Sequence, residues 1–511
     1  MSTLRIVFRT DANQQIGSGH FMRCLALADE LMRSQADISF VSRGLPLHFQ
    51  QMLRDRGVHY KALPETENLQ ETDELTHAAW LTTSQAKDAE QTMAALGKGA
   101  WDWLVVDHYA LDHRFEMPLR KICQHIMAID DLADRVHDCD VLLDQNFYQD
   151  QTKRYLDKVP SHSRQLLGPS YALLRSEFKA MRDKVQVRTG KVNNILVYFG
   201  GVDAENLTGQ VLDVLIKLNL SIQVTVVIGQ QHPQKEKIQQ LCAQHRFVCH
   251  VQTAQMASIM AEADLAIGAG GTSVWERCSL GLPSLCVATA ENQRQQLHDL
   301  QFAGMVYTPS IQEDALSFTG SFLKCLDKFT NSLQLQSQRM MALVDTLGVS
   351  KVTHILKSQA IHLRLADAND AQTIFNWRNH HAIRHFSGNT QEISLDEHHH
   401  WFKQRLIKNR GPILIGDINS QPLGVVRFDI SNDGASVSIY LVPESDLKGW
   451  GRCLLDRAEN WLRQHHPKVV KLHAQVLPNN EPSKKLFEKL NYNLTASMPQ
   501  LEFVKNLEAC S

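Results

Sequence analysis

The stretch RIVFRTDANQQIGSGHFMRCLALADELMRSQADISFVSR, residues 5–43, contains a strand-like run, a glycine turn, a helix-like segment and a second strand-like run. Apolar residues in the middle recur at helical spacing and predict one buried helix face: Met22, Leu25, Leu27, Ala28 and Leu31. A strand, a helix and a strand in this order predict a βαβ unit in a mostly parallel sheet. Further strand-like runs at 101–109 and 125–131 extend the pattern and predict a first Rossmann-type half over residues 1–175.

A second run of the same kind begins near Asn194. Its strand candidates alternate with helical lengths and cover residues 194–201, 221–229, 263–271 and 282–288. They predict a second doubly wound half at 190–357, after a charged helical connector at 174–193. Sheets of this class bind ligands beyond the carboxyl ends of their strands, so we expect a cleft between the two halves.

The pattern changes at residue 361. Strand candidates at 411–430, interrupted by an Asn-Ser-Gln-Pro turn, and at 435–444 precede a helical segment at 451–466. They predict an antiparallel sheet and therefore a separate α+β domain over residues 361–511.

Composition narrows the classes of function. A length of 511 residues predicts several domains, and a net charge of -2 disfavours a general nucleic-acid binder. The ten cysteines form no C-x-x-C pair, and neither a leader nor an apolar run of membrane-spanning length is evident. We expect a cytoplasmic protein with small-molecule substrates, no membrane partner and no metal.

The glycine turn at the start of the chain ends in a histidine. Gly17 and Gly19 precede His20 at the first turn of the predicted helix, where free N–H groups and the helix dipole favour an anion. The same dipole disfavours an imidazolium, so His20 is expected to stay uncharged near pH 7 and to accept a proton. A purely structural turn, with His20 as a helix cap, is the alternative.

A second glycine turn lies in DLAIGAGGTSVWERCSLGLPSLCV, residues 264–287. Gly270 and Gly271 would let the backbone, with Thr272 and Ser273, approach a diphosphate. Glu276 has two interpretations: it contacts the substrate, or it completes a capping box with Ser273.

Four further polar residues are candidate substrate contacts. Arg175 could bind phosphate or pair with Glu177, and Asn292 could bind substrate or cap a helix. Asp107 and Tyr109 end a buried strand at the expected cleft.

These motifs resemble one enzyme family. The runs 9–31, 105–112, 198–208 and 268–283 are similar to UDP-2,4-diacetamido-2,4,6-trideoxy-β-L-altropyranose hydrolases of pseudaminic acid biosynthesis, over about residues 4–350. The resemblance implies a GT-B-like pair of Rossmann-type domains, His20 as general base, Glu276 on the ribose of UDP, and metal-free C–O cleavage at the anomeric carbon with inversion.

The C-terminal part resembles GNAT acetyltransferases, in particular the branch that acetylates the 4-amino group of the UDP-aminosugar precursor. The resemblance rests on the runs 437–462 and 475–492. It implies acetyl-CoA as cosubstrate and these binding residues: Leu441, Val442, Lys448, Gly449, Trp450, Gly451, Arg452, Asn480 and Ser483. Phe487 stands where many relatives have a proton-donating tyrosine, and Asn491 replaces a usual glycine.

The sequence therefore predicts a bifunctional enzyme that acetylates a UDP-aminosugar and hydrolyses the product to free sugar and UDP. Two alternatives stay open: a GT-B glycosyltransferase in the first part, and a protein N-terminal acetyltransferase or inert GNAT module in the second. The run His398–His400 is not expected to bind a metal, because consecutive helical side chains point about 100° apart.

Overall fold

The computed structural model describes residues 3–65, 73–219, 221–308, 332–408, 411–431, 434–445, 447, 449–497 and 499–507. The chain divides into two compact units. The N-terminal unit is Arg5–Val352, and the C-terminal unit is Thr353–Ser511 together with Met1–Leu4. Each unit is described by itself.

The N-terminal unit begins with a seven-stranded, all-parallel sheet in the order β3-β2-β1-β4-β5-β6-β7. The strands are β1 (Arg5–Thr10), β2 (Asp37–Arg43), β3 (His59–Leu63), β4 (Trp101–Asp107), β5 (Cys123–Ile129), β6 (Val141–Asp144) and β7 (Arg164–Leu167). The strand order reverses between β1 and β4, so the loops that follow these strands flank the position at which doubly wound sheets bind ligands.

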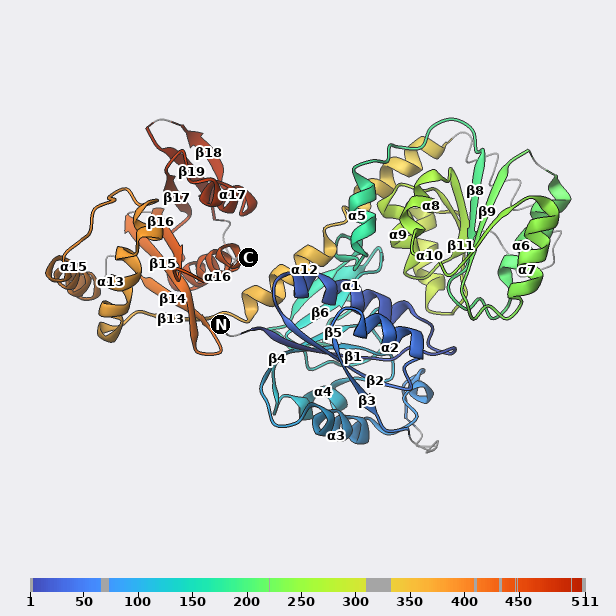
Figure 1. The fold of residues 1–511 in the computed structure, drawn as a ribbon, viewed down its shortest axis with the longest axis horizontal. Coiled ribbons are helices and arrows are strands. Elements are labelled where there is room, and N and C mark those ends of the chain that lie inside the picture. The colour runs from blue at the N-terminus through green and yellow to red at the C-terminus, as the bar shows by residue number, and fades with distance from the viewer. Residues whose placement is uncertain are drawn as a thin grey trace. The chain divides into compact units, whose positions relative to one another are not determined.

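Helices cover both faces of this sheet (Figure 1). They are α1 (Gly19–Arg33), α2 (Leu47–Arg54), α3 (Gln85–Leu96) and α4 (His113–Leu119), with short 3-10 turns η1 (Ala78–Trp80), η2 (Gln151–Lys153) and η3 (Pro169–Tyr171). Phe8 of β1 stacks on Phe40 toward the α1 and α2 side, whereas Val7 joins the cluster with Phe115 of α4. The period-2 alternation of the strand thus places apolar side chains on both faces.

The same unit contains a second, five-stranded parallel sheet in the order β10-β9-β8-β11-β12. Its strands are β8 (Asn194–Tyr198), β9 (Gln223–Ile228), β10 (Val248–Val251), β11 (Leu265–Ala269) and β12 (Ser284–Val287). The accompanying helices are α5 (Ser176–Arg182), α6 (Leu207–Leu218), α7 (Lys235–His245), α8 (Met256–Glu262), α9 (Ser273–Ser279), α10 (Gln293–Phe302) and a helix over 332–343. The boundary between the two units, Val352 to Thr353, falls within α12 (Gly348–Gln359). The order of the sheet reverses between β8 and β11. The two parallel α/β sheets are GT-B-like, as predicted.

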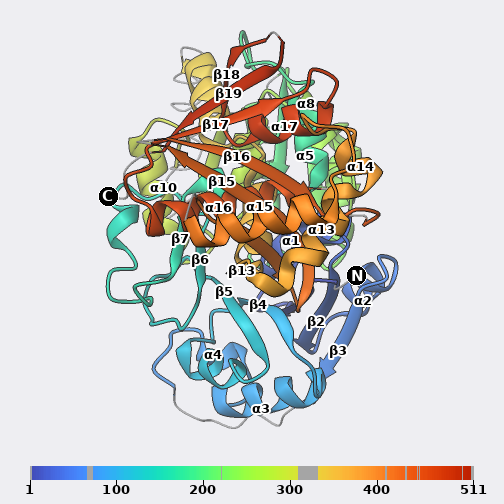
Figure 2. The same ribbon diagram turned by 90° about the vertical axis from the view of Figure 1, so that its left-hand side faces the viewer.

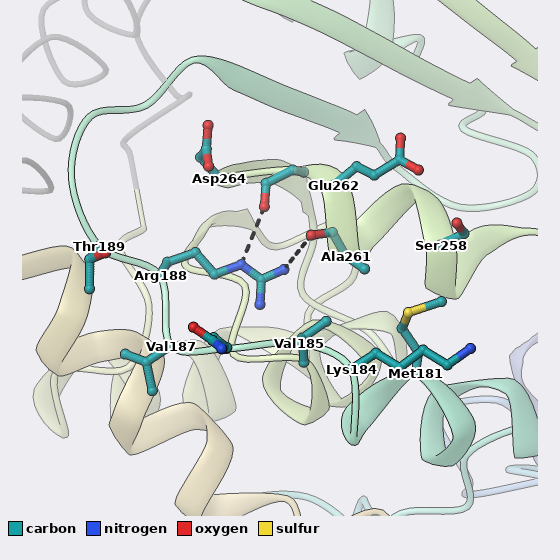
Figure 3. A pocket seen from close by; sticks show the side chains of 12 residues that line it. Met181, Lys184, Val185, Val187, Arg188, Thr189, Ser258, Ala261, Glu262 and Asp264 are labelled. Carbon is teal, nitrogen blue, oxygen red and sulfur yellow. Dashed lines mark hydrogen bonds between the residues drawn. The ribbon is translucent and has the colours of Figure 1, made fainter.

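The connector between the sheets is helical only over α5, a shorter helix than the sequence predicted. Beyond it, Arg188 is buried and donates from Nε to the carbonyl of Ala263 and from its terminal nitrogens to those of Met260 and Ala261, at the end of α8. Burial lowers the pKa of Arg188 to about 10. Figure 3 shows this guanidinium at the wall of a surface cavity. These side-chain to backbone hydrogen bonds hold the connector against the end of α8.

The C-terminal unit is a mixed sheet in the order β13-β14-β15-β16-β17-β19-β18, seen from the front in Figure 2. The strands are β13 (His362–Leu365), β14 (Ile413–Ile418), β15 (Gln421–Ser431), β16 (Gly434–Leu441), β17 (Lys471–Val476), β18 (Asn493–Ala496) and β19 (Leu501–Asn506). Its helices are η4 (Ala368–Asp370), α13 (Ala371–Asn379), α14 (His381–Arg384), α15 (Leu395–Lys408), α16 (Trp450–His465) and α17 (Glu481–Lys489). The predicted turn between β14 and β15 places Asn419 and Ser420 at φ 51° and 61°, which is the geometry of a tight hairpin.

Three properties of the described part of the chain bear on function. No helix there is both long and apolar enough to cross a membrane. No group of three His, Cys, Asp or Glu residues in these ranges is arranged to hold a metal ion. The eight cysteines that the structure describes are all free thiols.

Candidate functional site

His20 lies at the reversal point of the first sheet, on the second residue of α1. The turn before it closes through Gly17, which has φ +78° and donates its N–H to the Asn13 carbonyl at 2.8 Å. Such a positive φ favours glycine, so the turn geometry depends on this residue. Because α1 packs its apolar face on the sheet, the His20 side chain is 8% exposed and directed to the end of β4.

Asp107, the last residue of β4, orients His20. Its Oδ1 accepts a hydrogen bond from His20 Nδ1 at 2.5 Å, and its two oxygens also accept from Arg23 Nε and a terminal nitrogen, each at 2.7 Å. Burial opposes ionisation of this carboxyl, but the charges and hydrogen bonds of Arg23 and His20 hold the pKa of Asp107 well below its usual range. An ionised carboxylate accepts only, so the His20 Nδ1 that faces it carries a proton, and Nε2 is the ring nitrogen left to act as a base.

The expected role of Asp107 as a substrate contact needs correction. Its exposure is 0%, and both oxygens are occupied by protein donors. The sequence prediction placed it correctly at a strand end but could not show that α1 would lie over it. Asp107 is therefore a positioning residue for His20.

Tyr109 also differs from its predicted role. It is 7% exposed, and its hydroxyl donates to the Asp131 carboxylate. Its ring meets the His20 ring edge-on, with centroids 4.4 Å apart. Tyr109 therefore supports the imidazole rather than offering its hydroxyl to a substrate.

The reversal points of the two sheets meet at this turn. A Cβ on Gly19 would stand 3.6 Å from Thr272 Oγ1 in the turn after β11, and a Cβ on Gly201, after β8, would stand 3.6 Å from Ser18 Oγ. Residues in the loops after strands of the two different sheets therefore lie next to each other at this turn.

The turn after β11 is constrained on its inner side. The Gly270 N–H donates to the Val287 carbonyl at 2.9 Å, so this amide is occupied. A Cβ on Gly270 would lie 2.6 Å from Leu297 Cδ1, whereas Gly271 has only Gln293 nearby, at 3.5 Å. The N–H groups of Gly271 and the residues after it remain the candidates for a ligand at this turn.

The capping-box interpretation of Glu276 is wrong. In the described structure, α9 begins after Thr272 with no side-chain cap, and Glu276 Oε1 instead accepts from Arg175 at 3.0 Å. Arg175 also pairs with Glu177 at 2.6 Å. Both expected polar residues, Arg175 and Glu276, therefore lie together in a partly exposed ion pair.

Asn292 precedes α10. Within the described ranges its side chain makes no capping hydrogen bond, contrary to the alternative that it is a helix cap. It is half-buried, on the helix that supplies Leu297 beneath Gly270.

In the C-terminal unit, β16 and β17 separate. They pair in parallel only over Gly434–Ser436 and Lys471–His473, after which β16 continues to Leu441 beside β15 alone. Val442 follows, half-buried, and Gly449, at φ +80°, starts α16. The Lys448 prediction lies outside the described residues.

The other predicted cosubstrate residues of this unit take different environments. Gly451 and Arg452 lie half-buried in the first turn of α16, whereas the Trp450 ring is buried. Asn480 is 9% exposed, and its side chain accepts from the Ser483 N–H at 3.1 Å. The side chain of Asn480 thus caps α17 through its oxygen.

Phe487 and Asn491 depart from the family pattern without disturbing the fold. Phe487 is 3% exposed and packs on Tyr492 with ring centroids 5.0 Å apart. The Tyr492 hydroxyl donates to Glu459 at 2.8 Å, so it is engaged. Asn491 adopts φ 62°, the left-handed region that asparagine tolerates better than most residues.

Two groups of residues were missed by the sequence analysis. Arg23 lies three residues after His20 and could have been found as the next side chain on the same helix face. Trp80 and His77 come from a loop between β3 and α3, and no local signal linked this loop to His20.

Two family models match the chain. The glycosyltransferase family 28 C-terminal domain matches residues 194–351, and the acetyltransferase (GNAT) domain matches residues 361–493. The chain thus combines a nucleotide-sugar domain like that of glycosyltransferase family 28 with a GNAT acetyltransferase domain.

Three curated relatives extend this picture. An uncharacterised protein of Methanocaldococcus jannaschii is 23% identical over 98% of this chain and 99% of its own length. The UDP-2,4-diacetamido-2,4,6-trideoxy-β-L-altropyranose hydrolase of Campylobacter jejuni is 24% identical over 57% of this chain and 93% of its own. Acetyltransferase PseH of Campylobacter jejuni is 26% identical over 25% of this chain and 80% of its own. The hydrolase and the acetyltransferase are distant homologues of this chain.

Proposed function

We propose that this chain catalyses two consecutive reactions on a UDP-linked aminosugar. The C-terminal unit acetylates the 4-amino group of UDP-4-amino-4,6-dideoxy-β-L-AltNAc with acetyl-CoA. The N-terminal unit then hydrolyses UDP-2,4-diacetamido-2,4,6-trideoxy-β-L-altropyranose to free sugar and UDP. Distant similarity to a hydrolase and an acetyltransferase with these names supports the pairing.

The observation that carries the hydrolase proposal is the bond between His20 Nδ1 and Asp107. It directs the basic Nε2 away from the carboxylate, at the position where the glycine turns of the two sheets meet. A water bound to Nε2 gives its proton to His20 as its oxygen attacks C1 of the sugar. The C1–O bond breaks, its electrons leave with UDP, and one displacement inverts the anomeric centre.

The leaving group needs stabilisation of negative charge. In this proposal the amides after Gly270 and the guanidinium of Arg175 contact the diphosphate, while Glu276 and Asn292 contact the ribose and the sugar nucleotide. Arg175 is then released from Glu276 when substrate binds. Fixed donors at a developing charge lower the barrier without reorganisation, so no metal is required by this scheme.

The hydrolase proposal is tested by incubating the full chain with the diacetylated UDP-sugar and no acceptor. Release of UDP and free sugar is expected, with a loss of about 10²–10⁴-fold in kcat for His20→Ala. His59→Ala, at an exposed histidine of β3, is the matched control. Release of UDP only after an acceptor is added would favour a glycosyltransferase, as the matched family name suggests.

Charge in the C-terminal unit supports a phosphate-bearing acceptor. Arg378 lies near Tyr440, Arg427 and Arg384, and burial together with the two arginines lowers its pKa. Arg427 and Arg384 each pair with one carboxylate. Within the described ranges no carboxylate pairs with Arg378, which donates to the Asn389 carbonyl instead. This surplus of positive charge suits a diphosphate and opposes a polyamine.

Acetyl-CoA fits the same unit. The opening between β16 and β17 exposes strand edges, and the turn at Gly449 presents backbone N–H groups at the start of α16. Acetyl-CoA supplies the acetyl thioester. The 4-amino group attacks the thioester in its neutral form, and Phe487 cannot protonate the leaving thiolate, so that proton comes from water or another group.

The acetyltransferase proposal is tested by acetyl transfer to the UDP-aminosugar and to an N-terminal peptide. Transfer to the sugar alone is expected. Arg378→Gln should raise the KM for the UDP-aminosugar roughly tenfold or more without changing the KM for acetyl-CoA. Arg457→Gln, at an exposed position of α16, is the control. Preference for the peptide would reject the proposed acceptor.

A further inference from the structure

An aromatic cluster borders His20. Trp80 of η1 stacks on Tyr109 with centroids 5.6 Å apart and rings 23° from parallel, and its centroid is 6.3 Å from that of His20. His77 packs on both, at 4.5 Å from Trp80 and 5.2 Å from Tyr109. Three aromatic side chains from two loops thus converge on the proposed base.

Only part of this cluster is available to a ligand. Tyr109 is 7% exposed with its hydroxyl bound to Asp131, and His20 is 8% exposed. Trp80 and His77 are half-buried. Since Tyr109 covers one face of the Trp80 ring, the remaining indole surface is the apolar surface that the cluster offers beside the imidazole.

We propose that Trp80 binds the sugar ring of the nucleotide-sugar substrate through its apolar face, with His77 fixing the orientation of the indole. The inference rests on the proposed hydrolase function and names its sugar subsite. A 2,4-diacetamido-2,4,6-trideoxy sugar carries a C6 methyl group and two acetamido methyl groups, which favour contact with an indole. A fully hydroxylated sugar gains less from the same surface.

The sugar, rather than the uracil, is the expected occupant. His20 acts at C1, so the part of the substrate next to the imidazole is the sugar ring. The uracil is separated from C1 by two phosphates and a ribose. The glycine turn after β11, which we propose contacts the diphosphate, belongs to the other sheet. A platform at this position also shields one side of the sugar from bulk water, while His20 holds the attacking water.

The test measures binding in the His20→Ala background, in which substrate should be consumed about 10²–10⁴-fold more slowly. Calorimetry gives the Kd for UDP and for the UDP-diacetamido sugar, with and without Trp80→Ala. Trp80→Ala is expected to weaken sugar-nucleotide binding roughly tenfold and to leave UDP binding unchanged. Trp80→Phe should retain most of the affinity, and Trp461→Ala in α16 should have no effect.

Each result has one meaning. Equal weakening for UDP and sugar nucleotide would place the indole under the uridine and overturn the inference, as would no change for either ligand. Circular dichroism and a thermal melt of each variant identify loss of fold, and Trp80→Phe keeps the test open if Trp80→Ala unfolds. Failure of the wild-type chain to release UDP would reject the hydrolase proposal. The comparison of Kd values would still show whether Trp80 contacts the sugar.

Discussion

Replacement of Asp107 by asparagine tests the catalytic assignment most directly. The side chains have almost the same shape, but asparagine is uncharged and one of its two polar atoms is a donor. In the native site both oxygens of Asp107 accept, from His20 Nδ1 at 2.5 Å and from Arg23 at 2.7 Å. The variant must therefore place an N–H₂ group against a donor.

Either orientation of the amide damages the site. An amide nitrogen facing His20 forces Nδ1 to accept, which moves the ring proton to Nε2 and removes the base. An amide nitrogen facing Arg23 leaves that guanidinium with Asp131, at 3.2 Å, as its remaining carboxylate partner. We expect a kcat lower by about 10²–10⁴-fold, the usual range for loss of an oriented general base.

Stability separates the chemical effect from a structural one. Loss of one partner of a buried ion pair costs about 3–5 kcal/mol of unfolding free energy. The pair between Arg23 and Asp131 remains in the variant and should reduce this loss. Asp88→Asn is the matched control, because Asp88 is fully buried and pairs with Arg9 and Arg43 but does not contact His20.

The assay is UDP release per folded molecule, with the unfolding free energy measured by urea titration. Asp88→Asn should be destabilised yet keep its kcat, whereas Asp107→Asn should have both a lower unfolding free energy and a lower kcat. The reasoning is refuted if folded Asp107→Asn retains kcat within a factor of three of wild type, or if Asp88→Asn loses as much.

Three smaller predictions follow from local geometry. Gly270→Ala places a Cβ 2.6 Å from Leu297 Cδ1 and should weaken UDP binding and lower the Tm, as calorimetry and a melt would show; an unchanged Kd would contradict the assigned turn. Gly17→Ala meets no atom within 4 Å but keeps φ +78°, so it should cost about 1–2 kcal/mol of unfolding free energy by strain alone. Burial lowers the pKa of His354, but hydrogen bonds, first with Asp456, raise it to about 9. The stability that protonated His354 contributes is therefore complete below pH 6.5 and is lost as the pH rises through 9. Up to about 3 kcal/mol of unfolding free energy should be lost over that window, and His354→Gln should remove that part of the pH dependence measured by urea titration between pH 6 and 10.

Local sequence determined the architecture of this protein. The βαβ order, the glycine turns and the change of pattern at residue 361 are read from neighbours in the chain, and the two parallel sheets follow from them. The C-terminal sheet was predicted to be antiparallel and is mixed, because β16 pairs in parallel with β17. The turn at Asn419 and Ser420 was predictable for the same reason, because turn residues act through their own backbone. His20 was singled out because its place at a helix start after glycines is a local property.

Tertiary structure alone decided which partners each polar side chain meets. Asp107 and Tyr109 are 87 and 89 positions after His20 in the chain, and only the order β1-β4 brings them to it. Whether such a side chain contacts substrate or another residue depends on the helix that covers it, and this packing is not encoded in the spacing. The same holds for Glu276, which pairs with Arg175 across 101 positions instead of capping its own helix, and for Trp80, whose stack on Tyr109 exists only after the loop has folded onto the sheet.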